Sequence, residues 1–119
     1  MDRAAFLELR DLVWAVPVPR NVAAYSVRLC GASRPHEPGA SRYVQDYVAW
    51  GAGPRGSQNL VLAAKAHSLL EGRTAPTVAD IRQIALPILR HRIITNHRAV
   101  GDRVTAVDVV TNLLKEVPA

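Results

Sequence analysis

The chain has 119 residues, 49% of them apolar and 21% charged, which is enough to bury one hydrophobic core and argues for a single domain. Its longest uncharged apolar runs, NLVLAA and IALPIL, are far shorter than the ~20 residues that cross a bilayer, so we expect no membrane segment. Lys and Arg number 15 against 10 Asp and Glu, and the net charge of +5 weakly favours an anionic partner.

Cysteine content and the N-terminal sequence bear on the cellular compartment. Cys30 is the only cysteine, so the chain has no internal disulfide framework. The first residues, MDRAAFLELRDLVW, mix charges with apolar residues and lack the continuous apolar region of a secretory signal. We therefore expect a cytoplasmic protein.

Apolar residues recur at helical spacing, and no segment alternates over enough residues to indicate a strand. The sequence predicts an all-α fold, a small helical bundle of about five to six helices. The first helix is expected over about 4–15, where VPVPR breaks it. The second is expected over about 20–31 and ends at Gly31. The apolar positions of the first helix are Phe6, Leu9 and Val13.

Prolines and glycines divide the middle of the chain. SRPHEPGAS is expected to be a loop, after which Ser41 caps a short helix through RYVQDYVAW. Pro54 is expected to begin the next helix, which stops at Gly72. The apolar face predicted for this helix consists of Leu62, Ala66, Leu69 and Leu70.

Two later helices have strong start signals. TVAD at 77–80 and TAVD at 105–108 each offer a threonine N-cap with an aspartate three residues on, close to a capping box. The helix after Thr77 contains Pro87, which predicts a kink because proline cannot donate a hydrogen bond to the preceding turn. The last helix is expected over about 106–116.

Known catalytic motifs are absent from the sequence. It lacks the GxxxxGK[ST] pattern of a phosphate-binding loop, and no GxSxG frames a serine nucleophile. The histidines lack the i,i+4 spacing that places two metal ligands on one helix face, so we expect no metal site. The chain alone is not expected to be an enzyme.

The stretch WGAGPRGSQNL holds the strongest candidate for a binding site. Gly53 is a permissive N-cap, Pro54 takes the first helical position and Arg55 follows it. A helix start carries exposed amides and positive partial charge, so an arginine there is mildly unfavourable for folding. The exposed amides and the positive end of the helix, together with the Arg55 guanidinium, form a suitable binding site for a phosphate. Gly53, Pro54 and Arg55 are therefore candidate phosphate-binding residues.

Other conspicuous side chains have structural explanations. Arg90, His91 and Arg92 end a helix, where cations complement the helix dipole, although contact with a partner stays open. Trp14 and Trp50 are expected to anchor the core or to pack at a helix end.

Residues 50–93 resemble a known family. They contain, in order, a helix start similar to GASPRA, a GR turn, a cap similar to VTPEDV and an LRHR helix end, as in the C-terminal lid of MoxR-type AAA+ ATPases. YSVRLCGASR before them and LLKEVPA after them resemble the flanks of that lid. The resemblance implies that residues 17–119 form the helical lid and that residues 1–16 form a helix leading from a core domain.

The resemblance also implies a role for Arg55 and a set of partners. In that family the arginine of the PR pair is the catalytic sensor-2 residue, which contacts the γ-phosphate of ATP held with Mg by the core domain. It further implies a ring of subunits, typically a hexamer, that assists assembly or maturation of protein complexes, often with von Willebrand A-type proteins. Gly53 and Gly56 depart from the serine and alanine common in the family, which weakens the cap and loosens the first turn.

Two other functions stay open on the sequence. One is a basic helical module that binds nucleic acid, which would need arginines aligned on one exposed helix. The arginines in question fall instead on several elements: Arg73, Arg82, Arg90, Arg92 and Arg98. The other is a protein-interaction domain in which Arg55 has no ligand.

Overall fold

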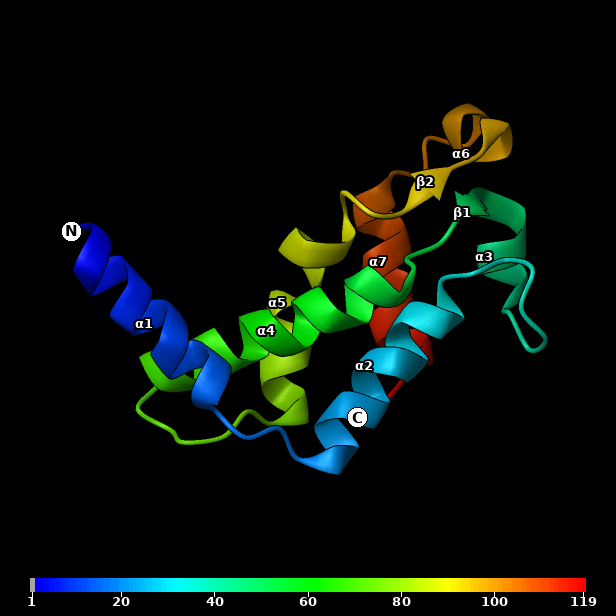
Figure 1. The fold of residues 1–119 in the computed structure, drawn as a ribbon. Coiled ribbons are helices and arrows are strands. Elements are labelled where there is room, and N and C mark those ends of the chain that lie inside the picture. Colours follow the sequence, from blue (N-terminus) through cyan, green and yellow to red (C-terminus); the bar gives the residue numbers. More distant parts are fainter. Residues whose placement is uncertain (1) are drawn as a thin grey trace.

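The structure, a computed structural model, describes residues 2–119, and helices dominate it (Figure 1). In chain order the elements are α1 (Arg3–Ala15), α2 (Arg20–Ala32), α3 (Arg42–Tyr47), β1 (Val48–Trp50), α4 (Pro54–Leu70), α5 (Val78–Leu89), β2 (Ile94–Thr95), α6 (His97–Gly101) and α7 (Ala106–Glu116). The prediction of a small helical bundle is confirmed. The helix missing from the prediction is α6, a short one that Asn96 caps through a hydrogen bond from the Ala99 amide.

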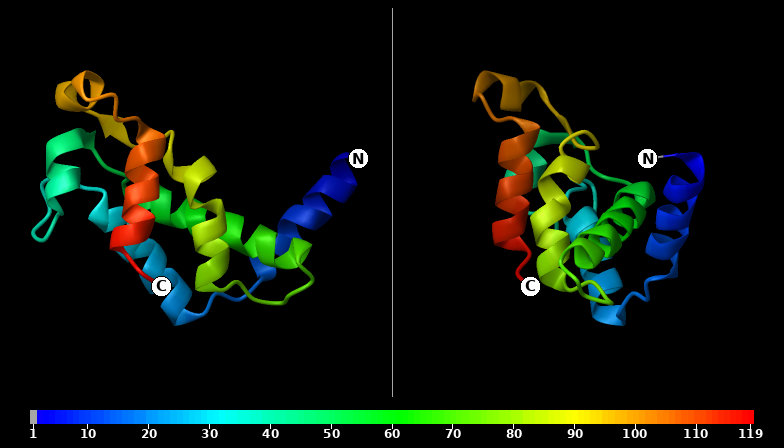
Figure 2. Two further views of the ribbon diagram at one scale, coloured as in Figure 1. Left: turned by 180° about the vertical axis from the view of Figure 1, so that it is seen from behind. Right: turned by 90° about the vertical axis from the view of Figure 1, so that its left-hand side faces the viewer.

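Four helices surround the core. α4 packs against both α2 and α5, and α7 contacts α2 and α5 on their other side. The two views in Figure 2 show α4 running through the middle of this group. The largest fully buried apolar side chains come from all four helices: Tyr25, Leu29, Leu60, Ile81, Leu89 and Leu113.

A small lobe lies at one end of the bundle, where α3, α6 and the two strands meet (Figure 1). β1 and β2 pair antiparallel, with Val48 opposite Thr95 and Trp50 opposite Ile94. Strands of three and two residues are too short to show an alternating pattern, so they cannot be recognised from the sequence.

α1 lies at the other end, beside the far half of α4, and the N-terminus points away from the bundle (Figure 1). The side chain of Asp2 caps it by accepting a hydrogen bond from the Ala5 amide. None of its residues is buried, and Phe6 is 58% and Leu9 47% exposed. The apolar face predicted for this helix is therefore not part of the core.

Several details of the sequence prediction are wrong. Gly31 lies inside α2, which continues to Ala32. Leu70, placed on the buried face of α4, is 86% exposed, because the face between α2 and α5 carries Leu60 and Ala64 instead. Of the two roles expected for the tryptophans, anchoring of the core is wrong, because Trp14 is 62% and Trp50 67% exposed, whereas Trp14 does pack beside α4 at the end of α1.

The end of α7 is tied back to the bundle by two side chains, the half-buried Arg82 and the buried Tyr25. Arg82 donates to the carbonyl of Leu114 at 2.8 Å and to that of Val117 at 3.1 Å. Its Nη1 also donates to the Tyr25 hydroxyl, which in turn donates to the Val117 carbonyl at 2.8 Å. One guanidinium thus joins α2, α5 and the segment after α7.

Among residues 2–119, no helix combines the length and the apolar character needed to cross a bilayer.

Candidate functional site

The start of α4 has the local structure predicted from GPR. Gly53 is the N-cap, in an extended conformation with φ −88° and ψ −170°, and Pro54 is the first helical residue. The amide of Gly56 donates to the Gly53 carbonyl at 2.9 Å, and the Ser57 hydroxyl donates to the Pro54 carbonyl at 2.8 Å. Because Gly53 has no side chain, no cap hydrogen bond forms.

Arg55 is exposed at this helix start. Among residues 2–119, its guanidinium has no ion-pair partner, and neither it nor the Arg55 amide makes a hydrogen bond within the chain. Pro54 carries no amide hydrogen, so the first free donor of α4 belongs to Arg55 itself. The geometry offers an anion one backbone N–H, one guanidinium and the positive end of the helix.

Gly56, where alanine is common in the resembling family, is buried in a tight contact. A methyl group on its Cα would lie 3.0 Å from the Ala52 Cβ and 3.3 Å from the Cys30 sulfur. Burial raises the pKa of the Cys30 thiol to about 11, with smaller opposing effects of Arg34 and Arg92. Cys30 is therefore a protonated residue that packs closely against Gly56.

The turn before α4 is pressed against the end of α2. A Cβ on Gly51 would lie 2.4 Å from the backbone oxygen of Ser33, so only glycine permits this approach. Ala52, the next residue, is fully buried. The position of the Arg55 helix start is thus set by contacts to α2.

Gly53 itself has free space around it. No heavy atom lies within 4 Å of a Cβ at this position, and its extended φ and ψ suit a serine N-cap. We expect Gly53→Ser to raise the free energy of unfolding by a few tenths of a kcal/mol, because its hydroxyl can accept from a free amide of the first turn. Urea unfolding of both chains measures this, and Gly53→Ala, which adds no acceptor, is the control.

Arg90, His91 and Arg92 follow α5 and are all exposed. Arg90 donates to the ring of His91 at 3.2 Å. When the Asn59 amide is oriented with its oxygen toward Arg92, that oxygen accepts from the Arg92 Nε at 3.2 Å. Asn59 lies one turn after Arg55 on α4, so Arg92 adds positive charge on the same side of the helix.

Other arginines are engaged in internal contacts. Arg82 ties down the segment after α7, and Arg98 approaches Asp46 at 3.4 Å. Arg73 forms two hydrogen bonds with Asp80, at 2.7 and 2.5 Å. Three of the arginines considered for a nucleic-acid-binding helix, Arg73, Arg82 and Arg98, are therefore not free to contact phosphates.

Asp80 is the centre of a buried polar network. It is 1% exposed and accepts from Arg73, from the Thr77 amide at 2.6 Å and from the His67 ring at 2.7 Å. The hydrogen bond from Arg73 lowers the pKa of the Asp80 carboxyl well below its usual range, against the opposing effect of burial. Arg73 of the GR turn and Asp80 of the TVAD cap thus form one ion pair.

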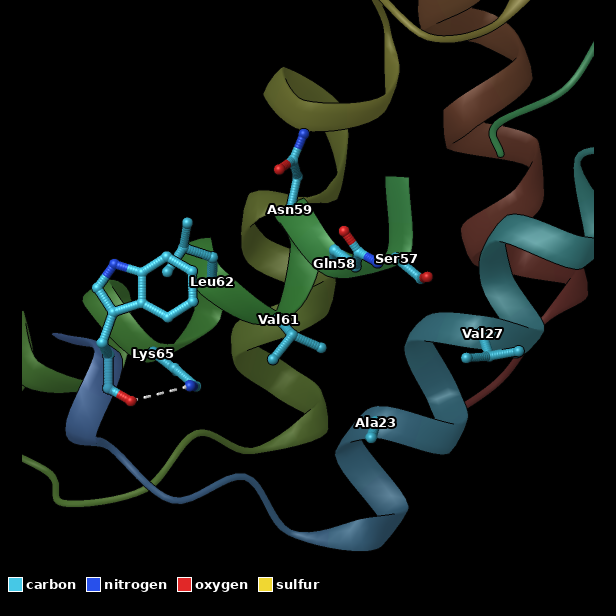
Figure 3. Close-up of a pocket in the computed structure, with 9 residues that line it drawn as sticks. Ala23, Val27, Ser57, Gln58, Asn59, Val61, Leu62 and Lys65 are labelled. Atoms are coloured by element: carbon cyan, nitrogen blue, oxygen red, sulfur yellow. Dashed lines mark hydrogen bonds between the residues drawn. The ribbon is translucent and has the colours of Figure 1, made fainter. Parts of the chain in front are cut away.

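Two apolar pockets lie along α4, and neither resembles a catalytic site. One, of about 390 Å³, lies between α2 and α4 near the end of α1 (Figure 3). Lys65 closes it at one side by donating to the Trp14 carbonyl at 3.4 Å. The other, of about 550 Å³, lies between α1 and α4 and is lined mainly by apolar side chains. No group of three or more metal-binding side chains occurs among residues 2–119.

The structure brings Gly53, Pro54 and Arg55 together at one exposed point, as predicted. Sequence reasoning missed Ser33 and Arg34, the two residues just after α2, whose side chains form hydrogen bonds with the backbone of Ala52. YSVRLCGASR contains both, but a contact between residues 18 positions apart leaves no local pattern that would identify it.

Comparison with known proteins identifies the family. Residues 40–113 match the AAA lid domain family. The chain is 31% identical over 111 residues to the chaperone MoxR1 of Mycobacterium tuberculosis, covering 93% of the chain and 29% of that protein. It is 39% identical over 74 residues to protein MoxR of Paracoccus denitrificans, covering 62% of the chain and 19% of that protein.

A solved structure agrees with these relatives. A crystal structure from Cytophaga hutchinsonii, of a protein assigned as an ATPase, matches 94% of this chain with a TM-score of 0.85 and 30% identity. The chain covers 34% of that protein, so it spans about a third or less of each relative. The chain therefore belongs to the AAA lid domain family and is a lid of the MoxR type.

Proposed function

We propose that this chain covers ATP bound to the core domain of a MoxR-like AAA+ ATPase, and that Arg55 contacts the γ-phosphate as the sensor-2 residue. One observation carries the proposal: Arg55 is an exposed arginine without an acidic partner among residues 2–119, at the start of the central helix of a MoxR-type lid. Gly53 and Pro54 form the backbone turn that presents it.

The rest of the ATPase supplies the chemistry that this chain lacks. In the proposal the core domain holds ATP with Mg, and the lid closes over the nucleotide so that hydrolysis drives motions in a cytoplasmic ring, typically a hexamer. The ring assists assembly or maturation of protein complexes, with von Willebrand A-type proteins as possible partners. Residues 1–16 lead from the core, and the apolar residues of α1 support this, because α4 leaves much of their surface exposed. Met1 of this segment lies outside the described residues.

The proposal predicts that the isolated 119-residue chain binds ATP only weakly. One guanidinium near a phosphate at an effective dielectric constant of ~20 offers about 4 kcal/mol, which corresponds to millimolar affinity before desolvation. Calorimetric titration of ATP into the chain measures this. Micromolar affinity would mean that the chain holds a complete nucleotide site, and the lid function would then be wrong.

A parallel titration tests nucleic acid as the alternative ligand. If several phosphates were neutralised, affinity for DNA or RNA would fall steeply with salt, because bound counterions are released. Gel shifts from low to moderate salt should show little binding near physiological ionic strength. Submicromolar binding that weakens steeply with salt would favour the nucleic-acid-binding module instead.

A further inference from the structure

We infer that Ser33 and Arg34, at the end of α2, are positioning residues for Arg55. The inference rests on the proposed function, because it assigns these residues to the placement of the sensor-2 arginine. Neither residue lies at the helix start that it positions. Both act through Ala52, the buried residue that precedes Gly53.

Ser33 and Arg34 together hold both polar backbone groups of Ala52. The Arg34 Nε donates to the Ala52 carbonyl at 2.9 Å. The Ala52 amide donates to the Ser33 hydroxyl oxygen at 2.8 Å, and that hydroxyl donates to the Cys30 carbonyl at 2.6 Å. Ser33 is fully buried, so its hydroxyl is fixed from both sides.

Few rotations separate Ala52 from Arg55. The ring of Pro54 fixes its own φ, so the backbone between them is free mainly at Gly53. Gly53 has no capping side chain, and no heavy atom lies within 4 Å of the place where a Cβ would stand, although its carbonyl accepts a hydrogen bond from the Gly56 amide at 2.9 Å. In this chain, the precision of the Arg55 position therefore depends on the anchoring of Ala52.

Arg34 has a second contact that orients its guanidinium. Its Nη1 lies 3.7 Å from the Glu37 carboxylate, while its side chain is 34% exposed. A methionine at this position would keep much of the packing volume but could not donate to the Ala52 carbonyl. A lysine could donate one hydrogen bond to it. Arg34→Met and Arg34→Lys thus separate the hydrogen bond from the bulk of the side chain.

The test uses residues 1–119 joined to a MoxR-type core domain, here called the joined protein. A displacement of a reacting group by about 1 Å can cost on the order of 10²-fold in rate. We expect Arg34→Met to lower kcat by about tenfold with a smaller change in KM, and Arg34→Lys to keep kcat within about threefold. Arg42→Met is the matched control, because Arg42 is 88% exposed and its ion pair is with Asp46, away from the start of α4.

A double-mutant cycle separates this inference from the proposed function. If Arg34 acts through Arg55, Arg34→Met should lower kcat in the parent protein and have no further effect in the Arg55→Ala background. If Arg55→Ala itself leaves kcat unchanged, the sensor-2 function is wrong. If Arg55→Ala lowers kcat but Arg34→Met does nothing, or acts equally in both backgrounds, only the positioning role is overturned.

Hydrogen exchange on the 119-residue chain supplies a readout that does not depend on activity. The Ala52 amide should be protected in the parent chain, because it is buried and bonded to Ser33. Ser33→Ala should remove most of that protection while the amides of α5 keep theirs. Exchange of the Ala52 amide at the rate of an exposed amide in the parent chain would overturn the inference.

Discussion

Replacing Arg55 with alanine or glutamate is expected to slow ATP hydrolysis by the joined protein about 10²-fold or more. A positioned cation on the transferring phosphoryl group is commonly worth a few kcal/mol in the transition state. Arg55 is exposed and contacts no acidic residue among residues 2–119, so its loss removes no internal ion pair. Steady-state ATPase rates of the parent and the variants measure the effect.

Arg55→Glu should not lower the free energy of unfolding of the isolated chain. A carboxylate in the first turn of α4 replaces a cation at the positive helix end, so Arg55→Glu should stabilise the isolated chain by roughly 0.3 to 1 kcal/mol at low salt. Denaturant unfolding tests this. Loss of folding in Arg55→Glu would make Arg55 a structural residue, and an unchanged ATPase rate would contradict the sensor-2 role.

Arg20 provides the matched control. It is the first residue of α2, is exposed and, like Arg55, sits in a first turn without acidic residues. Arg20→Glu should raise stability by a similar amount, for the same electrostatic reason. Its ATPase rate should equal that of the parent, because the proposal gives Arg20 no contact with the nucleotide.

The largest expected effect on stability is at Asp80. Asp80→Ala should lower the free energy of unfolding by about 3 kcal/mol, the lower end for breaking a buried ion pair, since Arg73 is 39% exposed and can recover water. Asp108→Ala should cost about 0.5 kcal/mol, because Asp108 completes the same kind of capping box on the surface. Urea unfolding of the two variants makes the comparison. Equal decreases in the free energy of unfolding would show that the network around Asp80 adds no stability beyond that of the capping box.

The Asp80 network also predicts a pH dependence. The folded-state pKa of Asp80 is lowered, so its contribution is complete above the usual aspartate range, about pH 4, and is lost as the pH falls toward the folded-state pKa. Unfolding free energies of the parent should therefore decrease from about pH 4 to pH 2 by more than those of Asp80→Asn, which carries no charge at this position. Parallel pH profiles would contradict this.

Helix starts were the most predictable part of the fold, because capping chemistry is local. Ser41, Thr77 and Thr105 are N-caps whose side chains accept the expected amide hydrogen bonds, and Pro54 opens α4. Gly72, predicted as a stop, has φ +75° just after α4. Each of these positions is determined by residues within one helical turn.

The buried faces were less predictable. α4 is apolar on more than one side, so periodicity alone could not choose between the row of Leu60 and Ala64 and the row of Leu62 and Ala66. The choice is made by α2 and α5, which enclose the first row. In the same way, the apolar face of α1 looked like a core face, although the lid offers it little cover.

The candidate site could be located from sequence, but not from charge alone. Arg3, Arg20 and Arg42 also open helices without an acidic residue in the first turn, so a cation at a helix start is common in this chain. Arg55 was singled out by the Gly53 and Pro54 helix start before it, and then by the resemblance of residues 50–93 to the MoxR lid. The hydrogen bonds of Ser33 and Arg34 with Ala52 join residues far apart in sequence, so they become apparent only in the folded structure.

The contacts of Arg82 and Tyr25 have a consequence for the order of folding during synthesis. Both side chains are in place once α5 has left the ribosome, yet their shared acceptor, the Val117 carbonyl, is made 35 residues after Arg82. Until then the Arg82 guanidinium and the Tyr25 hydroxyl lack the carbonyl oxygen that accepts their hydrogen bonds in the folded chain. The nascent helices α2, α4 and α5 can associate early, but Tyr25 and Arg82 gain their carbonyl partners only when residues 114–117 have been made, so α7 completes the hydrogen bonding of these two side chains.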